Sequence, residues 1–381
     1  MGYRRMKYMG SKRGMLRNGL GEILAEKVPQ SARFVDLFAG SSAVARHVAE
    51  HFPVPVLASD LQSYSSVLAD AVLLRTKTAD PAWIENWTSS ADKALRKHPD
   101  YSSFLALNDK IGAVAVSKVA AEARMLCSDA PEPIVRAYGG YYFSPLQSLM
   151  LHCFRNALPE LKATHRLGLA ALIEAASVCA AAPGHTAQPF KPNDTAGKFL
   201  AEAWAKDLWQ IAVRKAEAIG ATHALKKGRS VVGDANRVAS TLKENDLVFV
   251  DPPYSTVHYS RFYHVLETIA SAGDVQVSGV GRYPPAEDRP RSEYSIGSTA
   301  STAMHGLLEL LSERRCRVLI TFPANQASNG LSGDAVMAMA KEYFDVDSAT
   351  IHGRFSTLGG NTIHRSARQK SEELVLSLVP R

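Results

Sequence analysis

Short apolar runs alternate with helical patterns near the beginning of the chain. Residues 33–38 are mostly apolar and end in the small residues 39–42, and a helical pattern follows. A second apolar run at 54–58 is followed by a helical stretch over about 65–75. A strand, a tight turn and a helix in this order predict the opening of a parallel α/β sheet.

The middle of the chain has a different pattern. From residue 80 to about 226 the sequence shows helical segments and loops with few clear strands. Strand-like runs then resume at 230–234, 247–251, 317–322 and 373–378. We therefore predict a doubly wound, Rossmann-like α/β fold formed by residues 1–75 and 226–381, interrupted by a mostly helical domain inserted at 76–225.

The composition indicates a globular protein without a membrane span. Of 381 residues, 46% are hydrophobic and 21% are charged, which are ordinary globular values. The most apolar long run, 167–183, is interrupted by Glu174 and predicts a buried helix. Four cysteines without a C-x-x-C pair indicate neither a zinc knuckle nor a disulfide framework, so we expect a reduced, cytoplasmic setting.

Basic residues outnumber acidic residues by 44 to 37, for a formal charge of +7. Such a surplus is compatible with a polyanionic partner and does not by itself establish one. The H-x-x-E-H pattern at residues 47–51 lies on the predicted helix after the first turn, and no further carboxylate ligand is evident. We therefore predict no metal site.

The strongest chemical signal follows the apolar run 247–250, which leads directly into Asp251, Pro252, Pro253 and Tyr254. Ligands of open α/β sheets bind at the carboxyl ends of the strands. The carboxylate of Asp251 and the carbonyl of Pro252 suit the two N–H groups of an exocyclic amine, and Tyr254 offers a face for an extruded base. The alternative is a plain Asp-Pro-Pro turn that closes a buried strand.

These motifs resemble the α-order DNA N6-adenine methyltransferases, the family of the Dam methylases. The resemblance rests on residues 7–12, 36–42, 59–60, 251–254, 259–264 and 355–361. It is weakest in the insertion. The family resemblance implies S-adenosylmethionine as cofactor, double-stranded DNA as substrate, base flipping, and Asp251, Pro252, Pro253 and Tyr254 as the catalytic residues.

The resemblance also implies a cofactor site. Tyr8 and Lys12 would contact the cofactor, with Lys12 near its carboxylate, and Phe38 and Gly40 would shape the methionine pocket. Asp60 would accept hydrogen bonds from the ribose, and Asp234 would help to hold the adenine.

Simpler interpretations of these residues remain open. Asp60 could be a helix N-cap, Lys12 a solvated or phosphate-contacting lysine, and Asp234 part of a plain turn. Ser42 stands where the family usually has a second glycine, and a serine fits this turn if its φ is negative.

Two regions are candidates for choosing the DNA sequence, the insertion 76–225 and the polar loop 272–301 with its Arg282, Arg289 and Arg291. The aromatic cluster 141–143 could stack bases, but core packing is the more common fate of such residues. The alternatives to adenine methylation are methylation of cytosine at N4, an RNA adenine methyltransferase, and an inactive DNA-binding regulator. Asp251 favours adenine by the resemblance, and a cognate restriction endonuclease is a candidate partner.

Overall fold

The computed structural model describes residues 6, 8, 12–271, 273–323, 327–356 and 368–381, with the backbone alone described at 352–356 and 368–371. The chain divides into two compact units. The helical unit comprises Met1–Tyr8, Thr78–Ala221 and Ser260–Arg289, and the sheet unit comprises Met9–Lys77, Thr222–Tyr259 and Pro290–Arg381. The helical unit thus contains most of the expected insertion 76–225 and also residues 260–289, which the sequence analysis grouped with the sheet.

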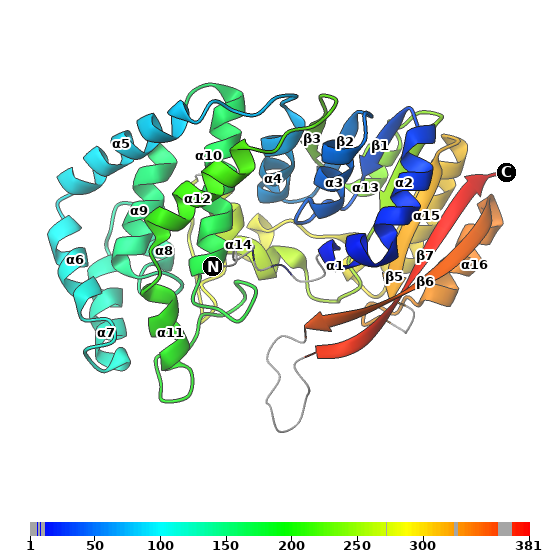
Figure 1. The fold of residues 1–381 in the computed structure, drawn as a ribbon. Helices are drawn as coiled ribbons and strands as arrows, with labels where there is room; N and C mark the ends of the chain where they lie inside the picture. Colours follow the sequence, from blue (N-terminus) through cyan, green and yellow to red (C-terminus); the bar gives the residue numbers. More distant parts are fainter. Residues whose placement is uncertain (1–5, 7, 9–11, 272, 324–326, 357–367) are drawn as a thin grey trace. The chain divides into compact units, whose positions relative to one another are not determined.

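The sheet unit alternates strands with helices (Figure 1). Its strands are β1 (Arg33–Asp36), β2 (Val56–Asp60), β3 (Arg229–Val232), β4 (Asp246–Val250), β5 (Arg317–Pro323), β6 (Phe344–Ser356) and β7 (Arg368–Pro380). Its helical segments are α1 (Arg13–Met15), η1 (Leu16–Leu20), α2 (Gly21–Lys27), η2 (Val28–Gln30), α3 (Ala43–His51), α4 (Ser63–Leu73), α13 (Ala235–Ala239), η4 (Glu293–Ser295), α15 (Ala300–Glu313) and α16 (Gly333–Tyr343).

In the described residues, seven strands form one sheet in the order β3-β2-β1-β4-β5-β7-β6. The first five strands in this order, β3, β2, β1, β4 and β5, pair in parallel with one another. Strand β7 runs antiparallel to both β5 and β6. This mixed α/β architecture is compatible with the expected Rossmann-like fold. Every predicted strand is present, but β6 was missed because its apolar and polar positions alternate only weakly beyond Val346.

Alternating side chains of the central strands divide between two cores. Phe34 and Leu247 pack on one face of the sheet with residues of α2 and α3, while Val35 and Val248 pack on the other face with residues of α13, α15 and α16. Strands with both faces covered are nearly continuous apolar runs, which is why β1 and β4 could be recognised in the sequence.

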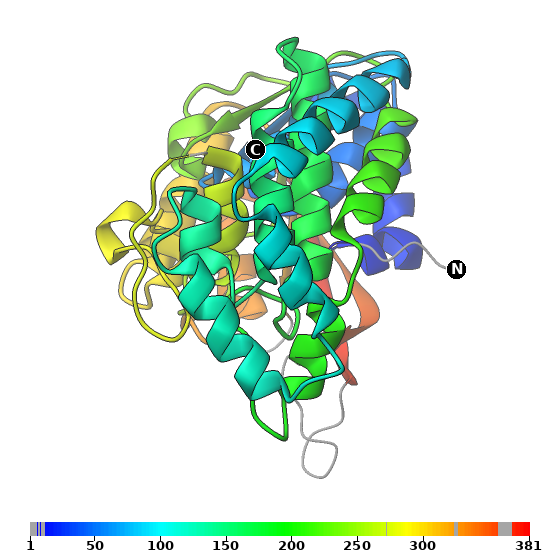
Figure 2. The same ribbon diagram turned by 90° about the vertical axis from the view of Figure 1, so that its left-hand side faces the viewer.

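The helical unit is built from helices that lie side by side (Figure 2). They are α5 (Ala82–Lys97), α6 (Tyr101–Asp109), α7 (Val116–Cys127), α8 (Pro133–Tyr138), α9 (Pro145–Asn156), α10 (Lys162–Cys179), α11 (Gly197–Trp204), α12 (Leu208–Gly220), α14 (Tyr259–Ser271) and the short turn η3 (Ala286–Asp288). The last thirteen residues of α10 are all buried, so the buried helix predicted at 167–183 is confirmed. Tyr142 and Phe143 are also fully buried, which confirms core packing for these two rings.

The loop 272–301 has more structure than its sequence suggests. It contains η3 and η4, and Ser278 pairs with Tyr283 in an isolated bridge. Tyr294 is buried in the sheet unit. Among the described residues, no helix is both long and apolar enough to cross a lipid bilayer.

Glu174, the acidic interruption in the apolar run, belongs to an ion pair in the interior of the helical unit. Its Oε2 lies 2.6 Å from Nζ of Lys215 on α12, and the two side chains are only 5% and 3% exposed. A buried charge is tolerated when it is paired, because an unpaired ion loses its hydration without compensation. This pair therefore explains how a glutamate fits within a buried helix.

We expect Lys215→Met to lower the free energy of unfolding by about 3–5 kcal/mol, because the carboxylate of Glu174 would be left buried without its cation. The double variant Glu174→Leu/Lys215→Met should recover most of this loss, since it removes both charges. Urea denaturation of the full chain measures both effects. A double variant as unstable as the single variant would show that packing, and not charge compensation, determines stability at this position.

Candidate active site

The order of the sheet places two loops next to each other at its centre. Strand order reverses between β1 and β4, which pair in parallel with Asp36 opposite Phe249. The loops that follow these parallel strands therefore leave the same edge of the sheet. Such a switch point is where open α/β sheets bind ligands. It brings together two motifs that are more than 200 residues apart in the chain, residues 36–42 and 251–254.

Lys12 lies between two carboxylates of the sheet unit. Its Nζ is 3.0 Å from Oδ1 of Asp251 and 2.6 Å from Oε2 of Glu373 on β7. The three side chains are 5%, 16% and 19% exposed, respectively. We call Lys12, Asp251 and Glu373 the ion cluster. The ammonium was expected near the cofactor carboxylate, yet it is engaged with two protein carboxylates, and its contact with a cofactor stays a prediction.

The ion cluster shifts the pKa of its members. Burial alone lowers the pKa of Lys12, but the charges of Asp251 and Glu373 more than offset this and raise it above its usual value. The pKa of Asp251 is raised overall, chiefly by burial, although the charge of Lys12 and hydrogen bonds from Lys12 and Thr321 act in the opposite direction. Lys12 is therefore firmly protonated, and it supports the ionised form of Asp251.

One side of Asp251 is left open. Its Oδ1 forms the ion pair with Nζ of Lys12 and accepts a hydrogen bond from Oγ1 of Thr321 on β5 at 2.9 Å. Among the described residues, neither Oδ2 of Asp251 nor the carbonyl of Pro252 has a hydrogen-bond partner. By contrast, the carbonyl of Pro253 accepts a hydrogen bond from the buried Asn329 at 3.2 Å. Two acceptors on consecutive residues thus remain for an external donor.

The ring of Tyr254 completes this edge of the site. It is partly buried, packs edge-on against Phe322 at 6.5 Å between ring centroids, and lies 5.9 Å from Nζ of Lys12. Asn329 also donates to the carbonyl of Tyr294 at 3.0 Å, so one amide fixes two neighbouring loops. The backbone around Tyr254 is therefore held by side chains, as expected of a preorganised site.

The turn after β1 is organised by Asp60 at the end of β2. Oδ2 of Asp60 accepts the backbone N–H of Gly40 at 2.8 Å, and Oδ1 accepts that of Gln62 at 2.9 Å. The N-cap of α4 is Gln62, so the interpretation of Asp60 as a helix N-cap is wrong. The carboxylate of Asp60 instead ties the glycine turn to the neighbouring strand.

Ser42 adopts a left-handed backbone conformation with φ of +56°, so the condition under which a serine was expected to fit this turn, a negative φ, is not met. This conformation costs a residue with a Cβ about 1–2 kcal/mol. Its Oγ donates to the carbonyl of Ser65 at 3.1 Å, an interaction that a glycine could not make. The turn therefore keeps the left-handed conformation that glycine favours, and the hydrogen bond to Ser65 of α4 stabilises the serine in it.

Asp36 adds a third acidic group beside Asp60 and Asp251. Burial, together with the negative charges of Asp251 and Asp60, raises the pKa of Asp36 to about 8. Aspartates thus end the adjacent strands β2 and β1 and follow directly after β4. With this pKa, Asp36 is mostly protonated at neutral pH. The negative charge of this edge therefore comes from Asp60 and Asp251, and it favours a cationic ligand.

The remaining predicted cofactor residues have separate environments. Phe38 packs edge-on against Tyr294, with 5.0 Å between ring centroids. Asp234 caps α13, where its Oδ1 accepts the N–H groups of Asn236 and Arg237. Tyr8 belongs to the helical unit, where it stacks on Tyr263 at 4.6 Å. Residues 7 and 9–11 of the N-terminal motif, and 357–361 of the last motif, lie outside the described residues.

Sequence reasoning missed Glu373, Thr321 and Asn329. Glu373 stands at the start of a predicted strand, and Thr321 is the polar position within an apolar one, so both carried a weak signal. Asn329 lies in an irregular segment and carried none. The pair His47 and His51 stacks on α3, and the described residues contain no group of three potential metal ligands.

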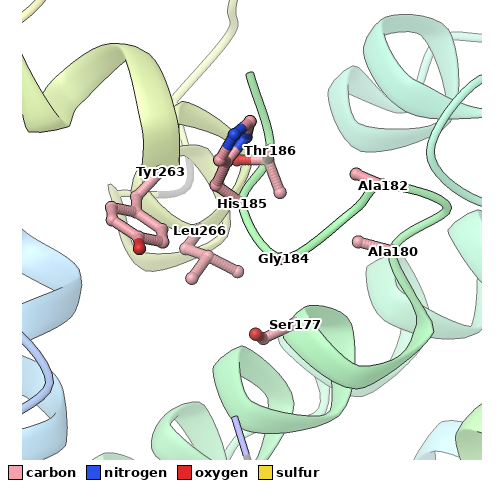
Figure 3. A pocket seen from close by; sticks show the side chains of 8 residues that line it. All are labelled: Ser177, Ala180, Ala182, Gly184, His185, Thr186, Tyr263 and Leu266. Carbon is pink, nitrogen blue, oxygen red and sulfur yellow. The ribbon is translucent and has the colours of Figure 1, made fainter. Parts of the chain in front are cut away.

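A small pocket in the helical unit is too small for a cofactor. It is lined by residues of α10, α14 and the loop between α10 and α11, including Ser177, His185, Thr186 and Tyr263 (Figure 3). Its volume of about 10 Å³ is the space that one water molecule requires. The strand ends of the sheet unit therefore remain the candidate site.

Comparison with known proteins agrees with the expected resemblance. Residues 8–126 and 194–295 match the family described as D12 class N6 adenine-specific DNA methyltransferase. The chain is also 23% identical over 334 residues to modification methylase LlaI of Lactococcus lactis subsp. lactis, which covers 84% of this chain and 46% of the relative. The chain thus spans about half the length of the curated relative it matches. Because the family match extends over more than half of its residues, the chain belongs to the D12 class N6 adenine-specific DNA methyltransferase family.

Proposed function

We propose that this protein is a site-specific DNA methyltransferase that transfers a methyl group from S-adenosylmethionine to the N6 amine of adenine. The observation that carries the proposal is the open acceptor pair formed by Oδ2 of Asp251 and the carbonyl of Pro252, next to the ring of Tyr254. The family match supports adenine, and the name of the relative, a modification methylase, supports DNA modification.

The acceptor pair addresses the central difficulty of the reaction, the delocalisation of the amine lone pair into the adenine ring. Asp251 and the Pro252 carbonyl accept the two amine hydrogens and so localise the lone pair on nitrogen. Tyr254 provides a face on which the flipped base stacks. The lone pair would attack the methyl group that bound S-adenosylmethionine supplies, the thioether would leave with the electrons of the C–S bond, and one amine proton would pass through Asp251 to solvent.

The sheet unit also fits the cofactor. When bound, S-adenosylmethionine supplies an electrophilic methyl group on a positively charged sulfur. The carboxylates of Asp60 and Asp251 supply negative charge where such a cation would bind. Phe38 and Gly40 would shape the pocket, Asp60 would bind the ribose, and Asp234 would contact the rest of the cofactor, while a contact from Tyr8 rests on the family resemblance alone. Lys12 is retained in the site as the partner of Asp251.

Methylation of cytosine at N4 is the nearest alternative, since it requires the same pair of acceptors. Digestion of DNA from an expressing host with methylation-sensitive nucleases, followed by single-molecule sequencing, identifies both the base and the motif. The same experiment separates an active enzyme from an inactive DNA-binding regulator. A cognate restriction endonuclease is the proposed partner if the protein serves in modification.

For recognition of the DNA sequence we propose the insertion 76–225, with help from the loop 272–301. The arginines of this loop differ in their surroundings. Arg282 donates from Nε and Nη2 to the carbonyls of Ala137 and Arg136 at the end of α8, at 2.9 and 3.0 Å. Arg291 is exposed. Arg289 is half-buried, donates from Nε to the carbonyl of Pro285 at 3.4 Å and lies over the ring of Tyr283. We therefore assign Arg282 and Arg289 to holding the loop, and Arg291 to the DNA.

Replacing Asp251 by Asn should lower kcat for methyl transfer about 10²- to 10³-fold, because the open carboxylate oxygen and its charge are lost. Transfer of labelled methyl groups from S-adenosylmethionine to DNA measures the effect. Asp334→Asn is a matched control, since Asp334 is an exposed aspartate in the first turn of α16. An Asp251→Asn enzyme with wild-type kcat would rule out the catalytic assignment.

Replacing Asp60 by Ala should weaken binding of S-adenosylmethionine about ten- to a hundredfold, the usual loss for a charge-assisted hydrogen bond. Calorimetry on the folded variant measures the affinity, and the melting temperature reports any damage to the Gly40 turn. Unchanged affinity in a folded variant would place the cofactor pocket elsewhere.

Arg282→Ala and Arg291→Ala should separate stability from DNA binding. The first should lower the melting temperature, because two backbone carbonyls lose their donor. The second should leave the melting temperature unchanged and either weaken DNA binding with a smaller salt dependence or relax the methylated motif at one position. If Arg291→Ala binds and methylates DNA like the wild type, this part of the loop does not contact the substrate.

A further inference from the structure

Glu373 lies closer to Lys12 than the proposed catalytic Asp251 does. Its Oε2 is 2.6 Å from Nζ, against 3.0 Å for Oδ1 of Asp251. The contact depends on the pairing of the last strand, because Glu373 on β7 is opposite Pro323 of β5, two residues beyond the Thr321 that bonds Asp251. The pairing of β5 and β7 therefore positions two of the groups that surround Asp251.

Without Glu373, Lys12 and Asp251 would form a neutral pair. With Glu373, two carboxylates share one ammonium, and the ion cluster keeps one negative charge. In a poorly hydrated site this difference matters, because charges interact more strongly there than in water. On the proposed function, the amine nitrogen gains positive charge as it takes the methyl group, so a net negative cluster stabilises the transition state more than a neutral pair does.

We propose that Glu373 is a positioning residue that shares Lys12 with Asp251 and so keeps the cluster negatively charged beside the substrate amine. The inference rests on the proposed function. It assigns to the last strand of the sheet a part in catalysis that the sequence motifs did not indicate.

The pKa directions agree with this role. The charged and titratable groups that face Asp251 are Lys12, Glu373, Tyr254 and Asp36. Glu373 raises the pKa of Asp251, whereas Lys12 lowers it. Activity that needs ionised Asp251 is lost as the pH falls through this pKa. Removal of Glu373 should therefore move the acid limb of kcat to lower pH, and removal of Lys12 should move it to higher pH.

The experiment compares the pH profiles of kcat for the wild type, Glu373→Gln, Lys12→Met and the double variant, with cofactor and DNA saturating. We expect Glu373→Gln to lower kcat about tenfold or more at neutral pH, with cofactor affinity within about twofold of wild type. The acid limb of Glu373→Gln should lie at the lowest pH and that of Lys12→Met at the highest pH. The double variant, which again has one negative charge, should lie between them.

Glu372→Gln is the matched control, because Glu372 is the exposed neighbour on the same strand and should behave like the wild type. Acid limbs that coincide, or that follow the reverse order, would overturn the proposal. If Glu373→Gln fails to fold, the acid limb of the double variant should still lie at lower pH than that of Lys12→Met, and a double variant whose limb coincides with or lies above that of Lys12→Met would overturn the proposal. Failure of the proposed function is distinguishable, since the wild type itself would then transfer no methyl groups to DNA.

Discussion

The need to neutralise one buried ammonium organises the active edge of the sheet. Lys12, the last residue of the N-terminal motif, is paired with Asp251 after β4 and with Glu373 on β7. A cation that is 5% exposed is stable only when anions surround it, so these three parts of the chain must come together. The orientation of Asp251 follows from this requirement, because Lys12 and Thr321 occupy one of its oxygens and leave the other open.

The sequence was sufficient to predict those parts of the fold that carry a local pattern. Strands such as β1 and β4, covered on both faces, are apolar throughout and end in the chemically distinctive residues 36–42 and 251–254. The edge strand β6 was not predicted because its alternation of apolar and polar residues is weak. Residues 260–289 were grouped with the sheet, since nothing local shows that α14 packs with the helices of the insertion.

The residues of the candidate site also differ in whether a local sequence pattern marks them. Asp251, Asp60 and Gly40 were recognisable because each follows an apolar run, and the structure brings them to one edge of the sheet. The partners of these residues were not recognisable, because Glu373 and Asn329 acquire their roles only through contacts between distant segments. The φ of Ser42 was likewise beyond local reasoning, since its hydrogen bond to Ser65 belongs to the packing of α4.

The antiparallel pairing of β7 between β5 and β6 has a consequence for biosynthesis. Lys12 leaves the ribosome before Glu373, which follows it by 361 residues. Until then the nascent chain has neither β7 nor the second carboxylate, and β6 has no strand to pair with. Contacts of such long sequence separation form late in folding. Synthesis therefore imposes an order of events, in which the charge balance of the site is established only after translation has passed residue 373.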